Sequence, residues 1–581
     1  MADSRSMHIL GINYSIDAAA ALIRDGEVIA ACKEERFSRI KHHAGFPNQA
    51  VDWCLSEGGI TLQDVDDVAF FWNPGIHAEP LHRNSAARRH HLEFLSSVPN
   101  ILLNRHFNQV PVQSVRQEFT LKGGHSLGIE YCTHHLTHSA GAFYRSNFEE
   151  SAILVVDGYG EKSSATVARG AGTKIEVLHQ IDFPHSVGSF YAAFTQYLGF
   201  KANNGEGKVM GLASYGQPSS YEDKIRQLVQ LTETGFELDL SYFSYFLERT
   251  RRYSPKLTTL LGPERHKDEP LTQRHFDIAY AMQKVTEEVL LHLAAITKEL
   301  TGSHRLCMSG GVVLNCVANS RILQESGFSE YYFQPCSGDG GTSMGAALLV
   351  AHRSGAPRVE HPMTDYLGPK FDNATIAHEL RRGGIAAARL NDTCKTAARV
   401  ISDGHIIGWF QGRAELGPRA LGNRSILCDP RRADMKDVLN ARVKFREPFR
   451  PFAPSITEEA CATYFDSNGV SSPFMILVFK TRTEHVTTLP SVTHVDGGAR
   501  VQTVSAEQNA RYHELISRVG QHTGVPCVLN TSFNVRGEPI VNTPSDALRC
   551  FFTTDMDALF LGDFLVTKTP ELHRQYQEID S

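Results

Sequence analysis

The sequence predicts an α/β protein with more than one domain, and three observations lead to that prediction. The chain has 581 residues, more than one hydrophobic core usually organises. An apolar strand followed by a hairpin opens the chain, and the same pattern recurs about 140 residues later. A stretch of changed composition then precedes a C-terminal section rich in Arg, Gly and Pro.

The repeated pattern predicts a duplicated N-terminal unit. His8–Tyr14 forms the first predicted strand, and AAAALIRDGEVIAACKEERF after it predicts a hairpin that turns at Asp25-Gly26. Ser151–Tyr159 forms the second opening strand, followed by strands in SSATVARGAG and KIEVLHQIDF. A strand and meander that open each half are typical of the actin, Hsp70 and sugar-kinase architecture. We therefore expect one large α/β unit with two lobes.

The boundary between the two sections is predicted near Asp365. Residues Ala351–Asn373 contain three Pro and show no clear periodicity, which is typical of a linker or crossover. We assign residues 1–355 to the N-terminal domain, 356–370 to the linker and 371–581 to the C-terminal domain.

Composition restricts the class of protein. The chain is 41% hydrophobic and 21% charged, as in ordinary globular proteins. The net charge of −6 is unfavourable for a nucleic-acid partner. No apolar run approaches the roughly 18 residues of a membrane span, and the N-terminus lacks the apolar core of a secretory signal. The 11 cysteines include no CxxC pair, so we expect reduced thiols in a cytoplasmic enzyme.

The first candidate site combines two histidines with two acids. His134 and His138 are four residues apart, which places them on one face of a helix. Asp157 in DGYGE and Asp339 in SGDGGTSMG stand beside Gly at predicted strand ends, where such folds place ligands. This set suits Fe(II), with Zn(II) as the second choice. The alternative is an ordinary histidine cluster, since the chain has 27 His.

The second candidate site is a glycine turn. Gly310 and Gly311 precede an apolar stretch that ends at Asn315, and glycine allows backbone N–H groups to approach a phosphate. Lys208 in NGEGKVMG is a candidate point charge for that phosphate. The alternative is a turn that binds nothing and a lysine without a specific role.

The third candidate site lies in the C-terminal section, where five arginines occupy loops stiffened by Pro: Arg413, Arg419, Arg424, Arg446 and Arg450. The guanidinium fork suits bidentate binding of phosphate or carboxylate. Asn530, Ser532 and Asn534 alternate in LNTSFN, so they face one side of a strand and are candidates to contact a nucleobase or ribose. The alternative is an Arg-rich surface held by salt bridges.

Seven motifs of the chain form a distinctive set: EERFSRIKHHAGFP, HHLTHSAGAFY, GKVMGLASYG, SGGVVLN, GDGGTSMGAAL, GPRALGNRSIL and FREPFRPFAPS. Together they resemble the carbamoyltransferase family, which includes antibiotic O-carbamoyltransferases and the nodulation-factor carbamoyltransferase. The resemblance implies an N-terminal domain of actin-like fold, similar to the tRNA threonylcarbamoyl-transfer subunit. It also implies a YrdC-like α/β C-terminal domain, similar to the threonylcarbamoyl-adenylate synthase.

The resemblance also implies an activity. In such enzymes the C-terminal domain makes carbamoyl adenylate from carbamoyl phosphate and ATP, with Mg²⁺ as the expected helper. The N-terminal domain then transfers the carbamoyl group, at a metal, to a hydroxyl or amine of a small-molecule natural product. We expect no nucleic-acid or membrane partner, and a homodimer stays open.

The family's site residues map onto matching positions of this sequence. The resemblance places the metal ligands on His134, His138, Asp157 and Asp339. It places the carbamoyl-adenylate contacts on Lys208, Gly310, Gly311 and Asn315. It places the ATP and carbamoyl-phosphate contacts on Arg419, Arg450, Arg500, Asn530 and Asn534.

One position departs from the family pattern. The family usually has a His before the Asp of the opening motif, thought to deprotonate the acceptor, whereas Ile16 precedes Asp17 here. Isoleucine cannot accept a proton, so the catalytic base is unknown. We expect an amine-type acceptor, a displaced base at His42 or His43, or weakened transfer. Residues 76–125 are expected to cover the acceptor pocket.

Two other functions stay open. A threonylcarbamoyl-type tRNA modification enzyme shares both domain folds, but the net charge and the fused GPRALGNRS motif disfavour it. A degenerate actin-like nucleotide-binding protein is disfavoured by the Arg-rich C-terminal section, although Ile16 keeps it open.

Overall fold

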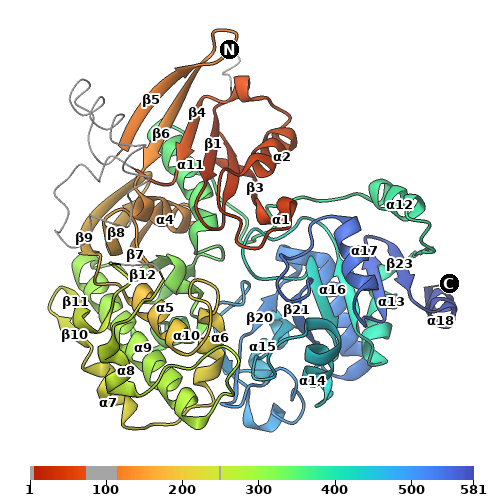
Figure 1. Ribbon diagram of the computed structural model, residues 1–581. Helices are drawn as coiled ribbons and strands as arrows, with labels where there is room; N and C mark the ends of the chain where they lie inside the picture. Colours follow the sequence, from red (N-terminus) through yellow and green to blue (C-terminus); the bar gives the residue numbers. More distant parts are fainter. Residues whose placement is uncertain (1–5, 74–113, 248–249, 581) are drawn as a thin grey trace. The chain divides into compact units, whose positions relative to one another are not determined.

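The computed structural model describes residues 6–73, 114–247 and 250–580, which form two compact units (Figure 1). Unit 1 contains the chain up to Glu34 together with Ala44–His361. Unit 2 contains Glu35–His43 together with Pro362–Ser581. Sheets and helices occur in both units, which confirms the predicted α/β class. The assignment of Glu35–His43 to unit 2 was not predicted from the sequence.

The first sheet of unit 1 has the strand order β3-β2-β1-β4-β6-β5. Its strands are β1 (His8–Asn13), β2 (Ala19–Arg24), β3 (Glu27–Lys33), β4 (Asp67–Phe70), β5 (Ser114–Thr120) and β6 (Ser126–Cys132). Strands β1, β4 and β6 run parallel, and β2 and β3 form an antiparallel meander. The predicted hairpin turn is confirmed, because Asp25 and Gly26 have φ of 51° and 89°.

The second sheet of unit 1 repeats this order as β9-β8-β7-β12-β13. Its strands are β7 (Glu150–Val156), β8 (Ser163–Ala171), β9 (Lys174–Asp182), β12 (Arg305–Ser309) and β13 (Glu330–Phe333). Strands β7, β12 and β13 are parallel, and β8 and β9 form the meander. The opening strand and meander seen in the sequence therefore correspond to the same strand order in both sheets.

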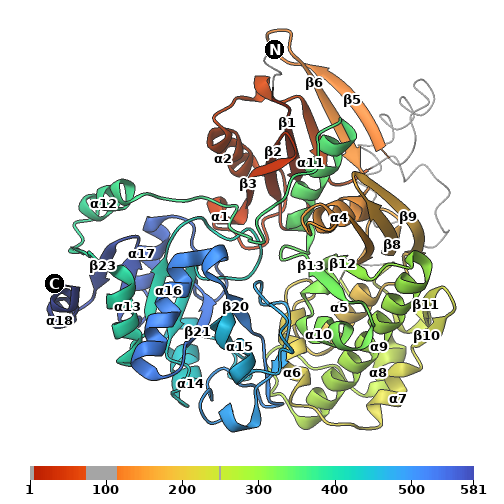
Figure 2. The ribbon, with the colours of Figure 1, turned by 180° about the vertical axis from the view of Figure 1, so that it is seen from behind.

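The helices of unit 1 pack against these two sheets or against one another (Figure 2). They are α2 (Asn48–Gly58), α4 (His134–Phe143), α5 (Val187–Tyr197), α6 (Glu206–Ala213), α7 (Tyr221–Arg226), α8 (Pro255–Leu261), α9 (Gln273–Thr301), α10 (Cys316–Glu325) and α11 (Thr342–Arg353). A small hairpin joins β10 (Val229–Thr232) to β11 (Gly235–Leu238). Helix α11 contacts the first sheet, α4 contacts the second, and the two helices contact each other.

Glycines allow the backbones in this contact to approach unusually closely. A Cβ atom at Gly345 of α11 would lie 1.9 Å from the carbonyl oxygen of Thr137 in α4. A Cβ atom at Gly11 of β1 would lie 1.9 Å from the carbonyl oxygen of Ser343 in α11. No side chain fits at such distances, so these two positions require glycine. The contact sets the position of α4 relative to the short turn η5 (Asp339–Gly341), which directly precedes α11.

Unit 2 is built on an eight-stranded sheet of order β14-β23-β22-β15-β16-β21-β17-β20. Its strands are β14 (Ala388–Arg389), β15 (Ile407–Phe410), β16 (Arg424–Cys428), β17 (Ala453–Thr457), β20 (Gln502–Val504), β21 (Cys527–Ser532), β22 (Ala558–Leu561) and β23 (Phe564–Thr567). A separate pair joins β18 (Phe479–Lys480) to β19 (Gly498–Ala499).

The helices of unit 2 are mostly short. They are α1 (Glu35–Ser38), α12 (Asn373–Arg382), α13 (Thr393–Ser402), α14 (Met435–Leu439), α15 (Glu458–Tyr464), α16 (Ala506–Thr523), α17 (Pro544–Phe552) and α18 (Pro570–Asp580). Trp409, Tyr512 and Phe560 are fully buried in the main core of this unit, which α13 and α16 cover on one side. Residues 411–423 form the loop that connects β15 to β16, and this loop carries Arg419.

The stretch between α11 and α12 contains no helix or strand, and all of its residues are described. Its first part packs on unit 1, because the Arg358 guanidinium donates to the carbonyl of Phe148 at 2.7 Å and Asn147 exchanges two hydrogen bonds with the backbone of His361. The change from unit 1 to unit 2 follows directly after His361.

Two general properties follow from the described residues. No helix among them is both long and apolar enough to cross a bilayer. All 11 cysteines lie in the described part of the chain, where they are buried and form no disulfide.

The glycine contact predicts a stability effect. Gly345→Ala should lower the free energy of unfolding by about 2 kcal/mol, because the added methyl group forces α11 away from α4. Thermal unfolding should then begin several degrees lower. Gly207→Ala in α6 is the control, since its Cβ would meet no atom within 4 Å. Equal midpoints for the two variants would contradict this account of the contact.

Candidate functional site

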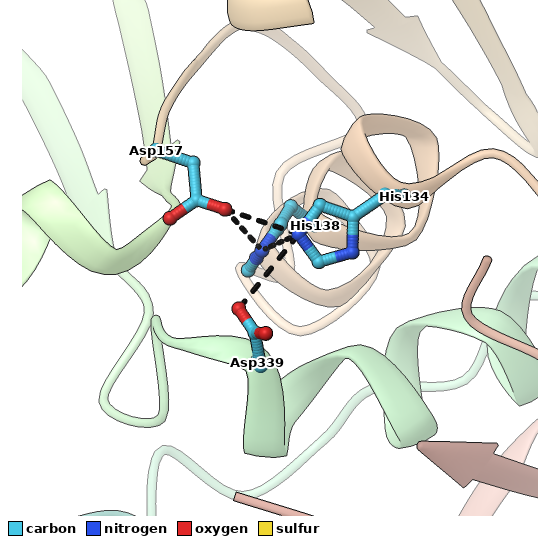
Figure 3. Close-up of side chains that lie close together, drawn as sticks. All are labelled: His134, His138, Asp157 and Asp339. Atoms are coloured by element: carbon cyan, nitrogen blue, oxygen red, sulfur yellow. Dashed lines mark hydrogen bonds and ion pairs between the residues drawn. The ribbon is translucent and has the colours of Figure 1, made fainter. Parts of the chain in front are cut away.

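Four side chains of unit 1 converge on one point (Figure 3). His134 and His138 lie on one face of α4, Asp157 directly follows β7, and Asp339 opens the turn η5. Nε2 of His134 is 3.0 Å from Oδ2 of Asp157, 3.2 Å from Nε2 of His138 and 3.7 Å from Oδ1 of Asp339. Nε2 of His138 is 3.7 Å from Oδ2 of Asp157. The predicted set of four is thus brought together from three distant parts of the sequence.

These separations match a metal site. Ligand atoms about 2.1 Å from a tetrahedral centre are about 3.4 Å apart, and the observed distances lie on both sides of that value. The two imidazole Nε2 atoms point at each other, an arrangement that a shared cation between them satisfies. Nitrogen and carboxylate ligands suit Fe(II) or Zn(II). The residues present therefore fit the predicted metal, and the assignment of these ligands stays a prediction.

Neighbouring groups hold three of the four side chains in place. The backbone N–H of Gly311 donates to Oδ1 of Asp157 at 2.8 Å, and Ser309 Oγ lies 3.1 Å from Nδ1 of His138. The hydroxyl of Ser15 donates to Oδ2 of Asp339 at 3.0 Å. Such outer contacts fix ring orientation and raise the affinity of a metal site. Sequence reasoning did not identify Ser15, because a serine in a turn carries no distinctive signal.

Buried charges shift the pKa values of the cluster. Burial opposes protonation of His134, but its hydrogen bond to Asp157 and the charge of Asp339 outweigh burial and raise its pKa to about 9. Burial also disfavours the charged form of Asp157, yet the two histidines hold its pKa well below the usual range. Burial raises the pKa of Glu161 to about 7, and its carboxylate accepts from the backbone N–H of His134. The metal-free cluster therefore carries a proton that a cation would replace.

The predicted adenylate contacts have structural partners. Gly310 has φ of 98°, and a Cβ there would lie 2.2 Å from the Val156 carbonyl. Gly311 holds Asp157, as described above. The side chain of Asn315 accepts from the Ala318 N–H at the start of α10 and exchanges two hydrogen bonds with Gln283. The glycine turn therefore shapes the histidine–aspartate cluster, and a nucleotide role for these residues and for Lys208 stays a prediction.

The position that departs from the family pattern lies beside this cluster. Ile16 is 40% exposed, and its neighbour Ser15 reaches Asp339. His42 and His43, the candidate replacement bases, belong to unit 2, where the His42 N–H donates to Glu35 and His43 contacts Ser38. Their role as a base stays a prediction. Of the segment expected to cover the acceptor pocket, residues 76–113 lie outside the described residues.

In unit 2, two of the predicted arginines in or next to the β15–β16 loop bind backbone carbonyls. Arg424 is fully buried, donates to the carbonyls of Gln411 and Pro369, and stacks 3.7 Å above the Phe410 ring. Arg413 donates to the carbonyls of Leu367 and Gly368. The expectation that Arg424 is an anion fork is therefore wrong, because both terminal nitrogens of this buried side chain donate to backbone carbonyls. For Arg413 the expectation stays a prediction.

A second cluster of unit 2 consists of cations. Burial and the nearby charges of Arg450 and Arg500 hold the pKa of Arg446 well below its usual range. Burial and the charge of Arg446 likewise lower the pKa of Lys444. Burial and mutual repulsion make such a group of cations unfavourable in a protein interior. Groups of this kind are typical of an anion-binding site. Lys444 was missed in the sequence, although it stands two residues before Arg446.

The two predicted asparagines support this region from β21. The Asn530 amide nitrogen donates to Ala420, next to Arg419, and to Ser455. Asn534 accepts from the Lys444 ammonium at 3.1 Å and donates to the Glu538 carbonyl at 2.7 Å. Asn534 thus binds a cationic residue, whereas Asn530 binds the backbone next to one. Direct contact of either side chain with a nucleotide stays a prediction.

Comparison with known proteins gives consistent matches along the chain. A carbamoyltransferase N-terminus model matches residues 8–348, and a carbamoyltransferase C-terminus model matches residues 398–568. Nodulation protein NolNO of Sinorhizobium fredii is 39% identical over 95% of this chain and 79% of its own. A Synechocystis protein of uncharacterised function is 40% identical over 98% of both chains. The 3'-hydroxymethylcephem-O-carbamoyltransferase of Streptomyces clavuligerus is 29% identical over 73% of both chains.

The charge state of the cluster predicts how metal binding depends on pH. At pH 7 we expect each metal-free chain to bind one Fe(II) or Zn(II) and to release about one proton from His134, whose pKa is about 9. The apparent affinity should therefore rise by up to about tenfold per pH unit as the pH approaches 9. Isothermal titration in buffers of different ionisation enthalpy measures the released proton.

Two variants test the assignment of the ligands. Asp157→Asn should weaken metal binding by at least about 100-fold, because it removes an anionic ligand. His266→Ala is the control, since this histidine of unit 1 is exposed. Unchanged affinity in Asp157→Asn, or metal binding without proton release, would exclude this site. In the metal-free chain the raised pKa of His134 should stabilise the fold fully below about pH 6.5, and that contribution should be lost as the pH rises through about 9.

Proposed function

The chain belongs to the carbamoyltransferase family, and from this we propose that it makes carbamoyl adenylate in unit 2 and transfers the carbamoyl group in unit 1. The enzyme is thus a transferase, and the proposal concerns its donor, its intermediate and the division of labour between units. The supporting observation is the separation of charge: unit 1 holds a buried histidine–aspartate cluster, and unit 2 holds a cluster of cations.

The chemistry assigned to unit 2 involves two anions. Water converts carbamoyl phosphate to carbamate and inorganic phosphate, and a carbamate oxygen then attacks the α-phosphorus of ATP and displaces pyrophosphate. The two substrates repel each other, so bringing them together needs fixed positive charge. Lys444, Arg446, Arg450 and Arg500 supply that charge, and Arg419 is the proposed contact from the β15–β16 loop. Mg²⁺ bound with ATP would neutralise part of the triphosphate charge.

The chemistry assigned to unit 1 is attack by the acceptor on the carbamoyl carbon, with AMP as the leaving group. A divalent cation held by His134, His138, Asp157 and Asp339 supplies Lewis-acid polarisation of the carbamoyl carbonyl and a template for the nucleotide phosphate. Gly311 and Ser15 keep Asp157 and Asp339 oriented during this step. The acceptor must lose one proton, to a protein base or to water.

The finer fold assignment belongs to the same proposal. The repeated strand order of the two sheets supports a duplicated actin-like architecture for unit 1. The YrdC-like fold proposed for unit 2 follows from the resemblance to the family, whose C-terminus model matches residues 398–568. A small-molecule acceptor is the expected partner, in keeping with the cephem named for one relative.

The exposed Ile16 bears on the kind of acceptor. A neutral amine attacks through its lone pair and loses its proton after the bond has formed, whereas an alcohol gains about 10²- to 10⁴-fold from a positioned base. Without a base at this position, an amine or another intrinsically nucleophilic acceptor is favoured. A degenerate protein that binds nucleotide without transfer is the second candidate, supported by the same residue.

Release of pyrophosphate tests the first half-reaction. The wild-type protein should convert ATP and carbamoyl phosphate to one pyrophosphate and one phosphate per turnover. Arg419→Ala should lower this rate at least tenfold, since a hydrogen bond to a charged group contributes about 1.5–3 kcal/mol. A coupled phosphate assay with and without pyrophosphatase measures both products.

His138→Ala is the matched control for that experiment. This variant should keep the rate of pyrophosphate release within about twofold of the wild type. The His138 side chain lies in the unit 1 cluster, which the proposed first half-reaction does not use. Full activity of Arg419→Ala would remove this loop from the proposed site. Absence of pyrophosphate from the wild type would favour the nucleotide-binding alternative.

Ile16→His tests the acceptor. The new imidazole should raise the rate of hydroxyl carbamoylation at least tenfold and leave amine carbamoylation nearly unchanged. Mass spectrometry of products from a panel of alcohols and amines gives both rates. His42→Ala and His43→Ala are run beside it, because loss of alcohol transfer in either would identify a displaced base. Rapid alcohol transfer that none of the three variants changes would contradict both explanations.

A further inference from the structure

The segment Glu35–His43 belongs to unit 2, although it is separated from the rest of that unit by more than 300 residues of sequence. Its second residue, Arg36, is 1% exposed, and one guanidinium nitrogen donates to the carbonyls of Gly417 at 3.0 Å and Glu415 at 3.4 Å. Both carbonyls belong to the β15–β16 loop, directly before Arg419. A buried cation from the N-terminal section therefore contacts the loop of the proposed anion site.

The rest of that loop is held from within the C-terminal section. The Glu415 carboxylate accepts from the backbone N–H groups of Leu421 and Asn423, and the Asp365 carboxylate accepts from the N–H of Gly417. These contacts satisfy N–H donors of the loop, whereas Arg36 satisfies its carbonyls. Around Gly417 both the N–H groups and the carbonyl groups of the backbone are thus hydrogen-bonded, and Arg36 is a donor to the carbonyls.

A second arginine fixes the segment itself. Arg39 donates to the carbonyls of Pro539 and Ile540 at 2.9 and 2.8 Å and pairs with Asp546 at 3.5 Å. The Glu538 carbonyl next to them accepts from Asn534, which in turn holds Lys444. The segment therefore contacts the β15–β16 loop and also the backbone that follows Asn534, the residue that binds Lys444.

The backbone of the segment is held in an unfavourable conformation. Arg39 and His42 both have left-handed φ, 59° and 56°, which non-glycine residues seldom adopt. Glu35 closes the segment by accepting from the backbone N–H of His42 at 2.9 Å. Strain of this kind persists where surrounding contacts determine the conformation and is concentrated at functional sites.

The segment also adds charge to the site. Lys41 is one of the cations whose field, together with burial and Arg446, lowers the pKa of Lys444. Lys41 stands between Arg39 and His42, the two residues with left-handed backbone. Its positive charge thus acts on Lys444, one of the cations of the proposed site.

We propose that Glu35–His43 is a working part of the anion site of unit 2, in which Arg36 is the positioning residue for the loop that carries Arg419. The activity part of its test rests on the function proposed above, and the structural part does not. Through this segment the chain before residue 44 controls the site that activates carbamoyl phosphate. A C-terminal section without it lacks both the Arg36 support and the Lys41 charge.

The test compares full-length Arg36→Met with the wild type. Hydrogen exchange should speed up at least tenfold for amides of residues 415–424 and stay unchanged in unit 1. The KM for carbamoyl phosphate in pyrophosphate release should rise at least fivefold, with a smaller change in kcat, because a displaced Arg419 weakens binding of the anion. Arg36→Lys should recover most of both effects, since an ammonium group can also donate to the two carbonyls.

Arg265→Met is the matched control. Arg265 is likewise a buried arginine that donates to backbone carbonyls, those of Leu198 and Glu269, but it lies in unit 1. It should leave exchange of residues 415–424 and the KM unchanged. If Arg36→Met does not fold, Arg36→Gln, whose shorter side chain does not span the same distance, replaces it in both measurements.

Each outcome decides the proposal. Faster local exchange with a raised KM and recovery by Lys supports it. Unchanged exchange of the loop overturns it, whatever the activity, and so does an equal effect of Arg265→Met. If the wild type releases no pyrophosphate, the proposed function fails, and the exchange comparison alone still decides whether Arg36 positions the loop.

Discussion

The backbone contact of α11 with α4 and β1 is the constraint on which the site of unit 1 depends. Because Gly345 and Gly11 bring main-chain atoms into direct contact, the helix that carries both histidines is held at a set distance from the turn that carries Asp339. Asp157 enters from the end of β7 and is held by Gly311. The cluster is therefore positioned by the packing of regular elements, which places ligands more rigidly than loops do.

The two proposed sites use opposite electrostatic arrangements. In unit 1 the two carboxylates carry negative charge that neutral imidazole rings cannot balance. The pKa of His134 is therefore raised, which favours a proton on this ring, and a bound cation would replace that proton. In unit 2, burial and the repulsion between neighbouring cations lower the pKa values of Arg446 and Lys444, and an anionic ligand would relieve that repulsion. In the proposed function a divalent cation would balance the first cluster, and the phosphate groups of the adenylation substrates would balance the second.

Residue type alone does not separate the roles of the arginines. Arg424 and Arg413 stand in the same motif as Arg419, yet they donate to backbone carbonyls, those of Gln411 and Leu367 among them. Arg36, far away in sequence, makes the same kind of bond to the same loop. A guanidinium group offers five donors in a plane, which suits backbone carbonyls as well as phosphate, and only its surroundings decide which it binds.

Local patterns in the sequence determined the opening strands, the first hairpin and the placement of two candidate metal ligands. Apolar runs identified the opening strands of both halves, Asp25-Gly26 identified the hairpin turn, and the four-residue spacing placed His134 and His138 on one helix face. Such features depend on φ/ψ preferences and on side-chain periodicity, which act over a few residues. Only the tertiary structure assigned Glu35–His43 to unit 2 and brought Ser15 to Asp339. It also showed that Arg424, unlike the role proposed for Arg419, binds backbone carbonyls. These decisions rest on contacts such as that of Arg36 with Gly417, 381 positions apart, and no local preference of the chain records which distant backbone a side chain will meet.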